Sequence, residues 1–294
     1  MPLDSTSQPL DALATPPARM LAYPRVLSIA GSDSGGGAGI QADLKTFAAL
    51  GCFGMTAVTA LTAQNTQGVR AIHGVPPEFL RAQIDAVVED IGVDAVKIGM
   101  LHAPEIVQAV AAAIDAHGLR QVVLDPVMVA TSGAVLIGQP AVQVLVRELF
   151  PRAVLVTPNL DEAALLAGRP LVSTDDMAQA ADELLARGAR AVLLKGGHLP
   201  GSEVADLLAT REGLRHWLRG PRIPSANTHG TGCTLSSAIA AQLALGAALV
   251  DAVEAARRYV RGALAAGAAV RTGAGSGPLN HGHAPRPQVV KAAT

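Results

Sequence analysis

The stretch VLSIAGSDSGGGAGIQAD, residues 26–43, joins an apolar run to a glycine-rich loop and then to a segment of helical period. Residues 26–30 are apolar except for one serine, which is typical of a strand buried on both faces of a sheet. The glycines that follow let the chain turn sharply before the helix begins. A strand that passes through a tight loop into a helix predicts a βα unit of an α/β fold.

The same alternation continues along the chain. Apolar runs predict further strands at residues 55–61, 95–98, 122–124, 154–156 and 191–194. Segments of helical period lie between them, with apolar side chains recurring as at Ile106, Val110 and Ile114. Alternating strands and helices predict a mostly parallel central sheet with helices on both faces.

The pattern changes after Lys195. Two short segments, residues 204–209 and 214–218, predict a hairpin, and two Ala-rich helices are expected between residues 231 and 270. We expect a single domain over residues 23–271, because α/β folds of this length often form one unit. Residues 1–22 lack an apolar period and predict a flexible extension. Residues 272–294 predict a mobile tail in which Pro278, Leu279 and Asn280 are the candidates for packing.

The composition excludes several classes of function. The chain has 294 residues and a formal net charge of −1, and no cluster of Lys and Arg is interleaved with aromatic residues, so we expect no nucleic-acid partner. No apolar run is long and clean enough to span a bilayer, so we expect no membrane segment. The two cysteines are too few for a disulfide framework, and the N-terminus lacks a secretory pattern. These features favour a cytoplasmic protein and leave small neutral or anionic ligands open.

The glycine loop after the first strand is the first candidate site. Its glycines and serines bring backbone N–H groups close to a ligand, and the helix that starts near Ala38 offers its positive end, so we predict binding of an anion or polar ligand. Gly37, Gly39 and Ala42 also fit the dinucleotide pattern G-x-G-x-x-A. That alternative needs an acidic residue about twenty positions later, and residues 47–67 contain none.

The second candidate site is NTHGTGCT, residues 227–234, at the start of a predicted helix. We expect the amides of Gly230, Thr231, Gly232 and Cys233 to point at one spot and to stabilise charge on a phosphoryl group in transfer. A thiol at a helix N-terminus can have its pKa lowered from about 8.5 to roughly 3.5–7.5. We therefore predict that Cys233 ionises readily and acts as a general base.

Polar residues that follow several predicted strands form the third group. Asp125, Asn159 with Glu162, and Lys195 follow three different strands, and ligands of open α/β sheets bind beyond the carboxyl ends of strands. Asp125 and Glu162 suit Mg²⁺, which retains most of its waters and needs few carboxylates. Asn159 and Glu162 also fit a helix capping box, which is the structural alternative. Gln64 can pair donor and acceptor groups with the edge of a heterocycle.

Together these motifs resemble the bacterial hydroxymethylpyrimidine/phosphomethylpyrimidine kinases in order and spacing. The resemblance extends from about residue 25 to 270. Its motifs are AGSDSGGGAGIQADLK at 30–45, VTALTAQNT at 58–66, KIGM at 97–100, DPVM at 125–128, TPNLDE at 157–162, LKGGH at 194–198 and HGTGCTLS at 229–236. The N-terminal extension and the C-terminal ending depart from the family pattern.

The resemblance implies a ribokinase-like three-layer α/β/α fold and a homodimer. It implies transfer of the ATP γ-phosphoryl group to 4-amino-5-hydroxymethyl-2-methylpyrimidine and then to its monophosphate, in thiamine biosynthesis, with Mg²⁺ as the metal. It places Gly31, Asp43, Gln64 and Met100 around the pyrimidine, and Asn159, Glu162 and Lys195 on the side of the phosphates and Mg²⁺. Two alternatives stay open, a pyridoxal or pyridoxine kinase of the same fold and a non-catalytic pyrimidine-binding protein.

Overall fold

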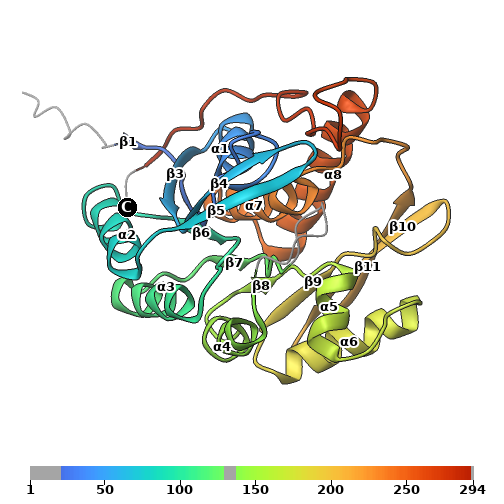
Figure 1. Cartoon of the computed structure of the whole chain (residues 1–294), viewed down its shortest axis with the longest axis horizontal. Helices are drawn as coiled ribbons and strands as arrows, with labels where there is room; N and C mark the ends of the chain where they lie inside the picture. Colours follow the sequence, from blue (N-terminus) through green and yellow to red (C-terminus); the bar gives the residue numbers. More distant parts are fainter. Residues whose placement is uncertain (1–20, 129–136, 293–294) are drawn as a thin grey trace, which may run out of the picture.

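The computed structural model describes residues 21–128 and 137–292. Its main sheet has eight strands in the order β11-β10-β9-β8-β7-β6-β2-β3 (Figure 1). The strands from β9 to β3 in that order are parallel, and β10 and β11 are antiparallel at one edge. The bounds are β2 (Arg25–Ala30), β3 (Phe53–Val58), β6 (Ala95–Ile98), β7 (Val122–Leu124), β8 (Leu155–Val156), β9 (Ala191–Leu194), β10 (Glu203–Thr210) and β11 (Arg215–Pro221). The predicted α/β class and mostly parallel sheet are confirmed.

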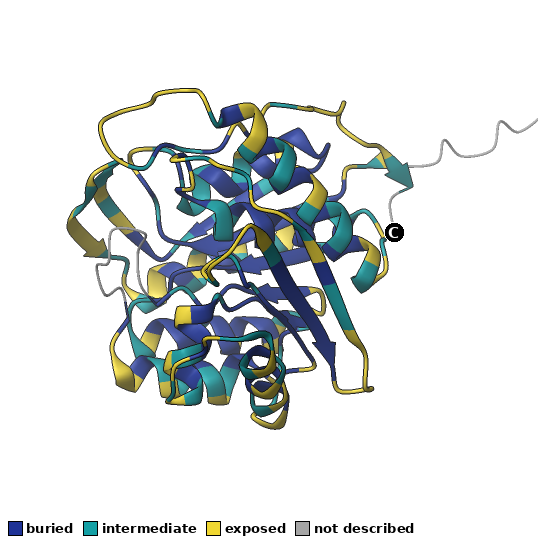
Figure 2. Ribbon diagram, turned by 90° about the vertical axis from the view of Figure 1, so that its right-hand side faces the viewer, coloured by how far each residue is buried: buried dark blue, intermediate teal, exposed yellow. Residues whose placement is uncertain are grey.

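Helices cover both faces of this sheet and complete three layers (Figure 1). The bounds are α1 (Gly39–Ala49), α2 (Pro77–Asp90), α3 (Pro104–His117), α4 (Gln139–Leu149), α5 (Leu160–Ala167), α6 (Thr174–Ala186), α7 (Thr231–Ala244) and α8 (Leu249–Gly267). Helices α2 to α6 pack on one face in a single apolar cluster, and α1, α7 and α8 pack on the other. Figure 2 shows the strands buried between these layers. None of the helices in the described ranges is both long and apolar enough to cross a bilayer.

The predicted strand at residues 55–61 is wrong in one respect, because the chain leaves the main sheet at Thr59. The Thr59 N–H donates to the carbonyl of Ala30, and its hydroxyl donates to the carbonyl of Met100 at 2.8 Å. The next residues form β4 (Ala60–Asn65), which pairs antiparallel with β5 (Gly68–Gly74) in a separate two-stranded sheet. This small sheet carries Gln64 over the carboxyl ends of the parallel strands.

The C-terminal segment packs on the domain at Leu279, which was one of the candidates for packing, and it continues to do so beyond that residue, where a mobile tail was expected. Leu279 and His281 are buried, and the Tyr259 hydroxyl of α8 donates to the carbonyl of His281 at 2.7 Å. Farther along, β12 (Lys291–Ala292) pairs with β1 (Leu21–Ala22). Between Leu279 and β12, the N–H groups of Asn280, Arg286 and Val289 donate to carbonyls of the domain, so this backbone is satisfied without a helix.

Candidate active site

One cavity of about 680 Å³ opens beyond the carboxyl ends of the parallel strands. Such an edge is where open α/β sheets bind ligands. Its wall contains every predicted site residue except Asp43. These residues are Gly31, Gln64, Met100, Asp125, Asn159, Glu162, Lys195, Gly230, Thr231, Gly232 and Cys233. Residues far apart in the chain therefore meet in one place.

The glycine loop builds the wall of this cavity, but most of its N–H groups are not free for a ligand. The Asp33 carboxylate accepts hydrogen bonds from the N–H groups of Gly35, Gly37 and Ala38, at 2.8, 3.1 and 2.9 Å. The N–H of Gly36 donates to the backbone carbonyl of Asp33. The prediction that this loop binds an anion through its amides is thus wrong for these four residues. Three of these N–H groups bind the internal carboxylate of Asp33, and that of Gly36 binds its backbone carbonyl.

The same loop makes a close backbone contact with the start of α7. A Cβ added to Gly230 would lie 1.9 Å from the carbonyl oxygen of Gly37, and Gly230 has φ of 81°. Both observations require glycine at this position, because another residue would be strained and would collide with the loop. The two glycine motifs are therefore packed against each other.

Asp33 and His229, which the sequence analysis did not single out, link these two motifs by a side-chain contact. His229 Nε2 lies 2.8 Å from Asp33 Oδ2 and 3.4 Å from Gln64 Nε2. Burial favours a raised pKa for Asp33, but His229 and the loop amides hold the pKa of this carboxyl below its usual range. Asp33 is therefore ionised at neutral pH. Both residues were present in the quoted motifs, but no pattern marked them as partners.

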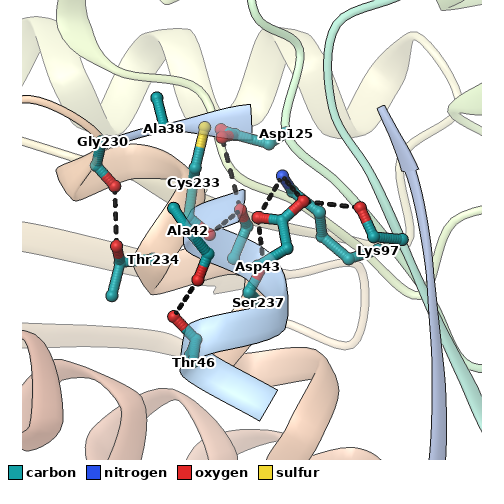
Figure 3. Close-up of polar contacts among 12 residues, drawn as sticks. Ala38, Ala42, Asp43, Thr46, Lys97, Asp125, Gly230, Cys233, Thr234 and Ser237 are labelled. Atoms are coloured by element: carbon teal, nitrogen blue, oxygen red, sulfur yellow. Dashed lines mark hydrogen bonds and ion pairs between the residues drawn. The ribbon is translucent and has the colours of Figure 1, made fainter. Parts of the chain in front are cut away.

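Asp43 lies beneath the cavity instead of on its wall, so the placement beside the pyrimidine is wrong. It is fully buried and accepts hydrogen bonds from Lys97 Nζ at 2.8 Å to both carboxylate oxygens. The hydroxyls of Ser28 and Ser237 each donate to it at 2.6 Å. Figure 3 shows this cluster between α1 and α7. The carboxylate has all its partners inside the protein and none left for a substrate.

The amide cradle at the start of α7 is smaller than predicted. The N–H of Thr231 donates to the carbonyl of Thr228 at 3.2 Å. The N–H groups of Gly230, Gly232 and Cys233 have no acceptor among the residues that the structure describes, and those of Gly232 and Cys233 lie in the first turn of α7. Two adjacent donors at a helix N-terminus still form a site for negative charge.

Lys195 lies directly beside this cradle and is held by Asp125. Lys195 Nζ donates to Asp125 Oδ1 at 2.9 Å and would lie 3.2 Å from a Cβ on Gly232. Burial favours a raised pKa for Asp125, but Lys195 and Lys97 lower the pKa of its carboxyl. Burial opposes the ammonium of Lys195, yet Asp125 and Glu162 raise its pKa. Both members of this pair are therefore charged at neutral pH.

Glu162 faces the same region from the first turn of α5, where it forms the capping box predicted as the alternative. The N–H of Glu162 donates to Asn159 Oδ1 at 2.9 Å, and the N–H of Asn159 donates to Glu162 Oε2 at 2.8 Å. Burial raises the pKa of Glu162 to about 7, with Lys195 opposing and Asp125 adding to the rise. The capping box does not remove Glu162 from the cavity, because this residue still lines its wall.

These groups fit a hydrated Mg²⁺. Asp125 and Glu162 are two buried carboxylates on one cavity wall. The positive charge of Lys195 does not offset the burial of Glu162, so this carboxyl is not fully ionised at neutral pH. A divalent cation would supply that charge. Asp125 already accepts from Lys195, which suits contact through the waters that Mg²⁺ retains.

The prediction of an easily ionised Cys233 is wrong in this structure. Burial raises the pKa of the Cys233 thiol to about 11; Lys97 lowers it, Asp43 and Asp125 raise it further, and the N–H of Gly39 lowers it. Desolvation of the thiolate therefore exceeds the favourable effect of the helix terminus. At neutral pH the resting residue is a neutral thiol.

Comparisons with known proteins agree with this geometry. The family model for phosphomethylpyrimidine kinase matches residues 33–280. The chain is 53% identical over 258 residues to the hydroxymethylpyrimidine/phosphomethylpyrimidine kinase of Rhizobium meliloti (strain 1021), covering 87% of this chain and 96% of that protein.

Solved structures show the same fold. The crystal structure of phosphomethylpyrimidine kinase from Clostridium difficile 630 is similar with a TM-score of 0.72 and 42% identity, over 81% of this chain and 97% of that one. The ADP complex of Bacillus subtilis pyridoxal kinase is similar with a TM-score of 0.81 and 37% identity, over 88% and 98%. With a matching family model over most of its length and a relative of this identity, the chain belongs to the phosphomethylpyrimidine kinase family.

Proposed function

We propose that this protein transfers the γ-phosphoryl group of ATP to 4-amino-5-hydroxymethyl-2-methylpyrimidine, and then a second one to the monophosphate. We assign the step to thiamine biosynthesis, because a bifunctional thiamine biosynthesis protein of Geobacter sulfurreducens is 50% identical to this chain over 265 residues. The observation that carries the proposal is that one cavity is lined both by Gln64 and by the amide cradle of Gly232 and Cys233. An acceptor and a phosphoryl donor can therefore meet there.

On the acceptor side, we assign the pyrimidine to Gly31, Gln64 and Met100. Met100 closes one wall, because its Cε would lie 2.5 Å from a Cβ on Gly31. The Gln64 carboxamide can donate to a ring nitrogen and accept from an exocyclic amino group. The Thr62 hydroxyl donates its proton to the carbonyl of Ser32 at 2.7 Å and lies 3.1 Å from the Gln64 amide oxygen, so that oxygen keeps its capacity to accept from a ligand.

On the phosphoryl side, two N–H groups at the start of α7 and the ammonium of Lys195 surround the position for transferred charge. A loose transition state spreads charge over the equatorial phosphoryl oxygens, so such donors lower its energy without bond making of their own. Asn159 and Glu162 bound the same wall, and Glu162 with Asp125 would hold the Mg²⁺ of Mg-ATP through its waters. When bound, that ion neutralises charge on the β- and γ-phosphate oxygens.

We assign the proton of the first acceptor to Cys233. The hydroxymethyl oxygen bonds to the γ-phosphorus while its proton passes to Sγ, and the bond from the γ-phosphorus to the β,γ-bridging oxygen breaks as ADP leaves. Because the resting thiol is protonated, it must first release its proton to solvent. The monophosphate is different, since its second pKa is about 6 and its attacking oxygen is already ionised at neutral pH.

This difference gives a test of the base. Cys233→Ala should lower kcat for the first phosphorylation by about 10² to 10⁴, the usual contribution of a general base, with little change in KM. The second phosphorylation should lose less than about tenfold. Equal losses in the two steps would assign Cys233 to packing or to the amide cradle instead of proton transfer.

The overall function is tested with purified protein and Mg-ATP. Mass analysis should find the pyrimidine monophosphate first and the diphosphate later. Pyridoxal is the rival acceptor, because the chain also resembles a solved pyridoxal kinase. A kcat/KM for pyridoxal above that for the pyrimidine, or pyrimidine binding without ATP turnover, would replace the proposal by one of its two alternatives.

We also propose that the protein is a homodimer. The two-stranded sheet of β4 and β5 stands off the main sheet and exposes apolar side chains, with Leu61 and Ile72 at 50% and 43% exposure. Light scattering on the purified protein should give twice the mass of the chain. A monomer at micromolar concentration would contradict this assignment.

A further inference from the structure

Lys97 is a buried, firmly held cation near the amide cradle, and the proposed mechanism assigns it no role. Lys97 is at the end of β6 and has no exposed side-chain surface, yet it lines the cavity. Its Nζ contacts both oxygens of Asp43 at 2.8 Å, and Asp43 is itself held by two serine hydroxyls. A buried carboxylate with four hydrogen bonds orients the ammonium firmly.

The ammonium also has capacity beyond Asp43. A lysine has three N–H donors, and within the described ranges Asp43 supplies the only side-chain or backbone oxygens that Nζ contacts. Gly99 lies tightly against it, since an added Cβ would lie 3.0 Å from Nζ. Burial alone would lower the pKa of Lys97, but Asp43, Cys233 and Asp125 raise it, so the side chain remains charged.

This charge acts on Cys233. Figure 3 shows Lys97, Asp43 and Cys233 extending from β6, α1 and α7 toward the same region. Of the charged groups that face the thiol, Lys97 has the largest effect in favour of the thiolate, while Asp43 and Asp125 oppose it. Lys195 faces the same region from the end of β9 and is paired with Asp125. Asp43 thus fixes Lys97 and partly cancels its effect.

We propose that Lys97 supplies the positive charge against which Cys233 loses its proton, and that Asp43 serves to hold Lys97 in place. Both are positioning residues that act through the thiol. The inference rests on the proposed role of Cys233 as base. It assigns Asp43 a function in the reaction although that residue does not reach the substrate.

The test measures the thiol itself, in a Cys52→Ala background where Cys233 is the only cysteine. The rate of alkylation by iodoacetamide at pH 8 is proportional to the thiolate fraction when the pKa is far above 8. Loss of a neighbouring opposite charge shifts a pKa by about one to three units. A more basic thiolate is also a stronger nucleophile, which offsets nearly half of this loss on a logarithmic scale, so Lys97→Met should slow alkylation about three- to fiftyfold. A purely structural effect would expose the thiol and accelerate the reaction, so the two explanations predict opposite signs.

Two further variants keep the test decisive. Lys97→Met leaves Asp43 buried without its partner and can fail to fold, whereas Lys97→Met with Asp43→Asn removes both charges. The double variant should also alkylate more slowly than the parent, by a smaller factor, because the opposing charge has gone too. Lys291→Met, which breaks a distant ion pair of 2.9 Å with Asp94, is the matched control and should leave the rate unchanged.

The results separate this inference from the proposed mechanism. Circular dichroism first establishes that each variant is folded. A folded Lys97→Met protein, or a folded double variant, that alkylates at the parent rate or faster overturns the inference. If alkylation slows as expected but Cys233→Ala keeps its kcat for the first phosphorylation, the charge coupling stands and only the base assignment fails.

Discussion

Glu162→Gln should make the protein more stable at neutral pH and less active. Burial raises the pKa of the Glu162 carboxyl from an ordinary 4.5 to about 7. Below pH 4.5 the carboxyl is protonated in both the folded and the unfolded chain, so it adds nothing to the pH dependence of stability. Between pH 4.5 and 7 only the unfolded chain ionises, and this destabilises the fold progressively. Above pH 7 the penalty is complete and amounts to about 3 kcal/mol.

Glutamine removes this penalty and keeps one oxygen to accept from the N–H of Asn159, now 2.8 Å from the carboxylate. At pH 8, without metal, we expect Glu162→Gln to raise the free energy of unfolding by about 3 kcal/mol and Tm by roughly 5 to 10 °C. At pH 5 the gain should be below about 1 kcal/mol. Thermal unfolding by circular dichroism in EDTA at the two pH values measures both.

Glu78→Gln is the matched control, because Glu78 is also in the first turn of its helix but is exposed. Its effect should be within about 0.5 kcal/mol at both pH values. The Glu162 variant should lose Mg²⁺-dependent turnover while it gains stability. A gain that is equal at pH 5 and pH 8, or a loss at pH 8, would refute the argument that an incompletely compensated buried carboxylate sits in this cavity.

The other predictions concern the acceptor, the cradle and the thiol. Gln64→Ala leaves the polar edge of the pyrimidine unpaired at a cost of about 1 to 3 kcal/mol, so KM for the pyrimidine should rise at least about fivefold with KM for ATP unchanged; an unchanged pyrimidine KM removes Gln64 from the site. Gly232→Pro deletes one cradle N–H and should lower kcat by about 10² to 10³; undiminished kcat in a folded variant contradicts the cradle. Because the pKa of Cys233 is about 11, its thiolate fraction rises with pH, and kcat/KM for the first acceptor should rise about tenfold per unit from pH 7 to 9. A flat profile there argues against a thiolate base.

How well each part of the fold was predicted depends on the burial of its strands. The bounds of β6, β7 and β9 agree with the apolar runs in the sequence, because these strands are buried on both faces and are bounded by polar or glycine residues. The departure of the chain at Thr59 was missed, since Ala57, Val58, Ala60 and Leu61 read as one continuous run. The contacts that mark the break are with distant residues, such as the hydrogen bond from the Thr59 hydroxyl to Met100, forty-one positions away.

Positions on the cavity wall were predicted for residues at the ends of strands, and Gln64 and Lys195 do line the cavity. Asp43 was misplaced because a carboxylate in a helix can face either the cavity or the core, and its sequence neighbours do not decide which. Its partners Lys97 and Ser237 lie 54 and 194 positions away. The hydrogen bonds from the loop amides to Asp33 were also missed. An internal carboxylate and a ligand anion satisfy the same N–H donors, and the sequence does not show which of the two is present.

The pKa of Cys233 was predicted in the wrong direction because two opposing effects act on it and only one is visible in the sequence. A helix N-terminus favours a negative charge by about 0.3 to 1 kcal/mol, which is less than one pKa unit. Burial of an ionisable group can raise an acid's pKa by up to about three to five units. The sequence shows that Cys233 lies at a helix N-terminus but does not show how far the thiol is buried. The prediction therefore included the helix terminus, which is the smaller effect, and left out the burial. A nearby cation is then needed to lower the pKa of the buried thiol again, and Lys97, which lines the same cavity as Cys233, has this effect.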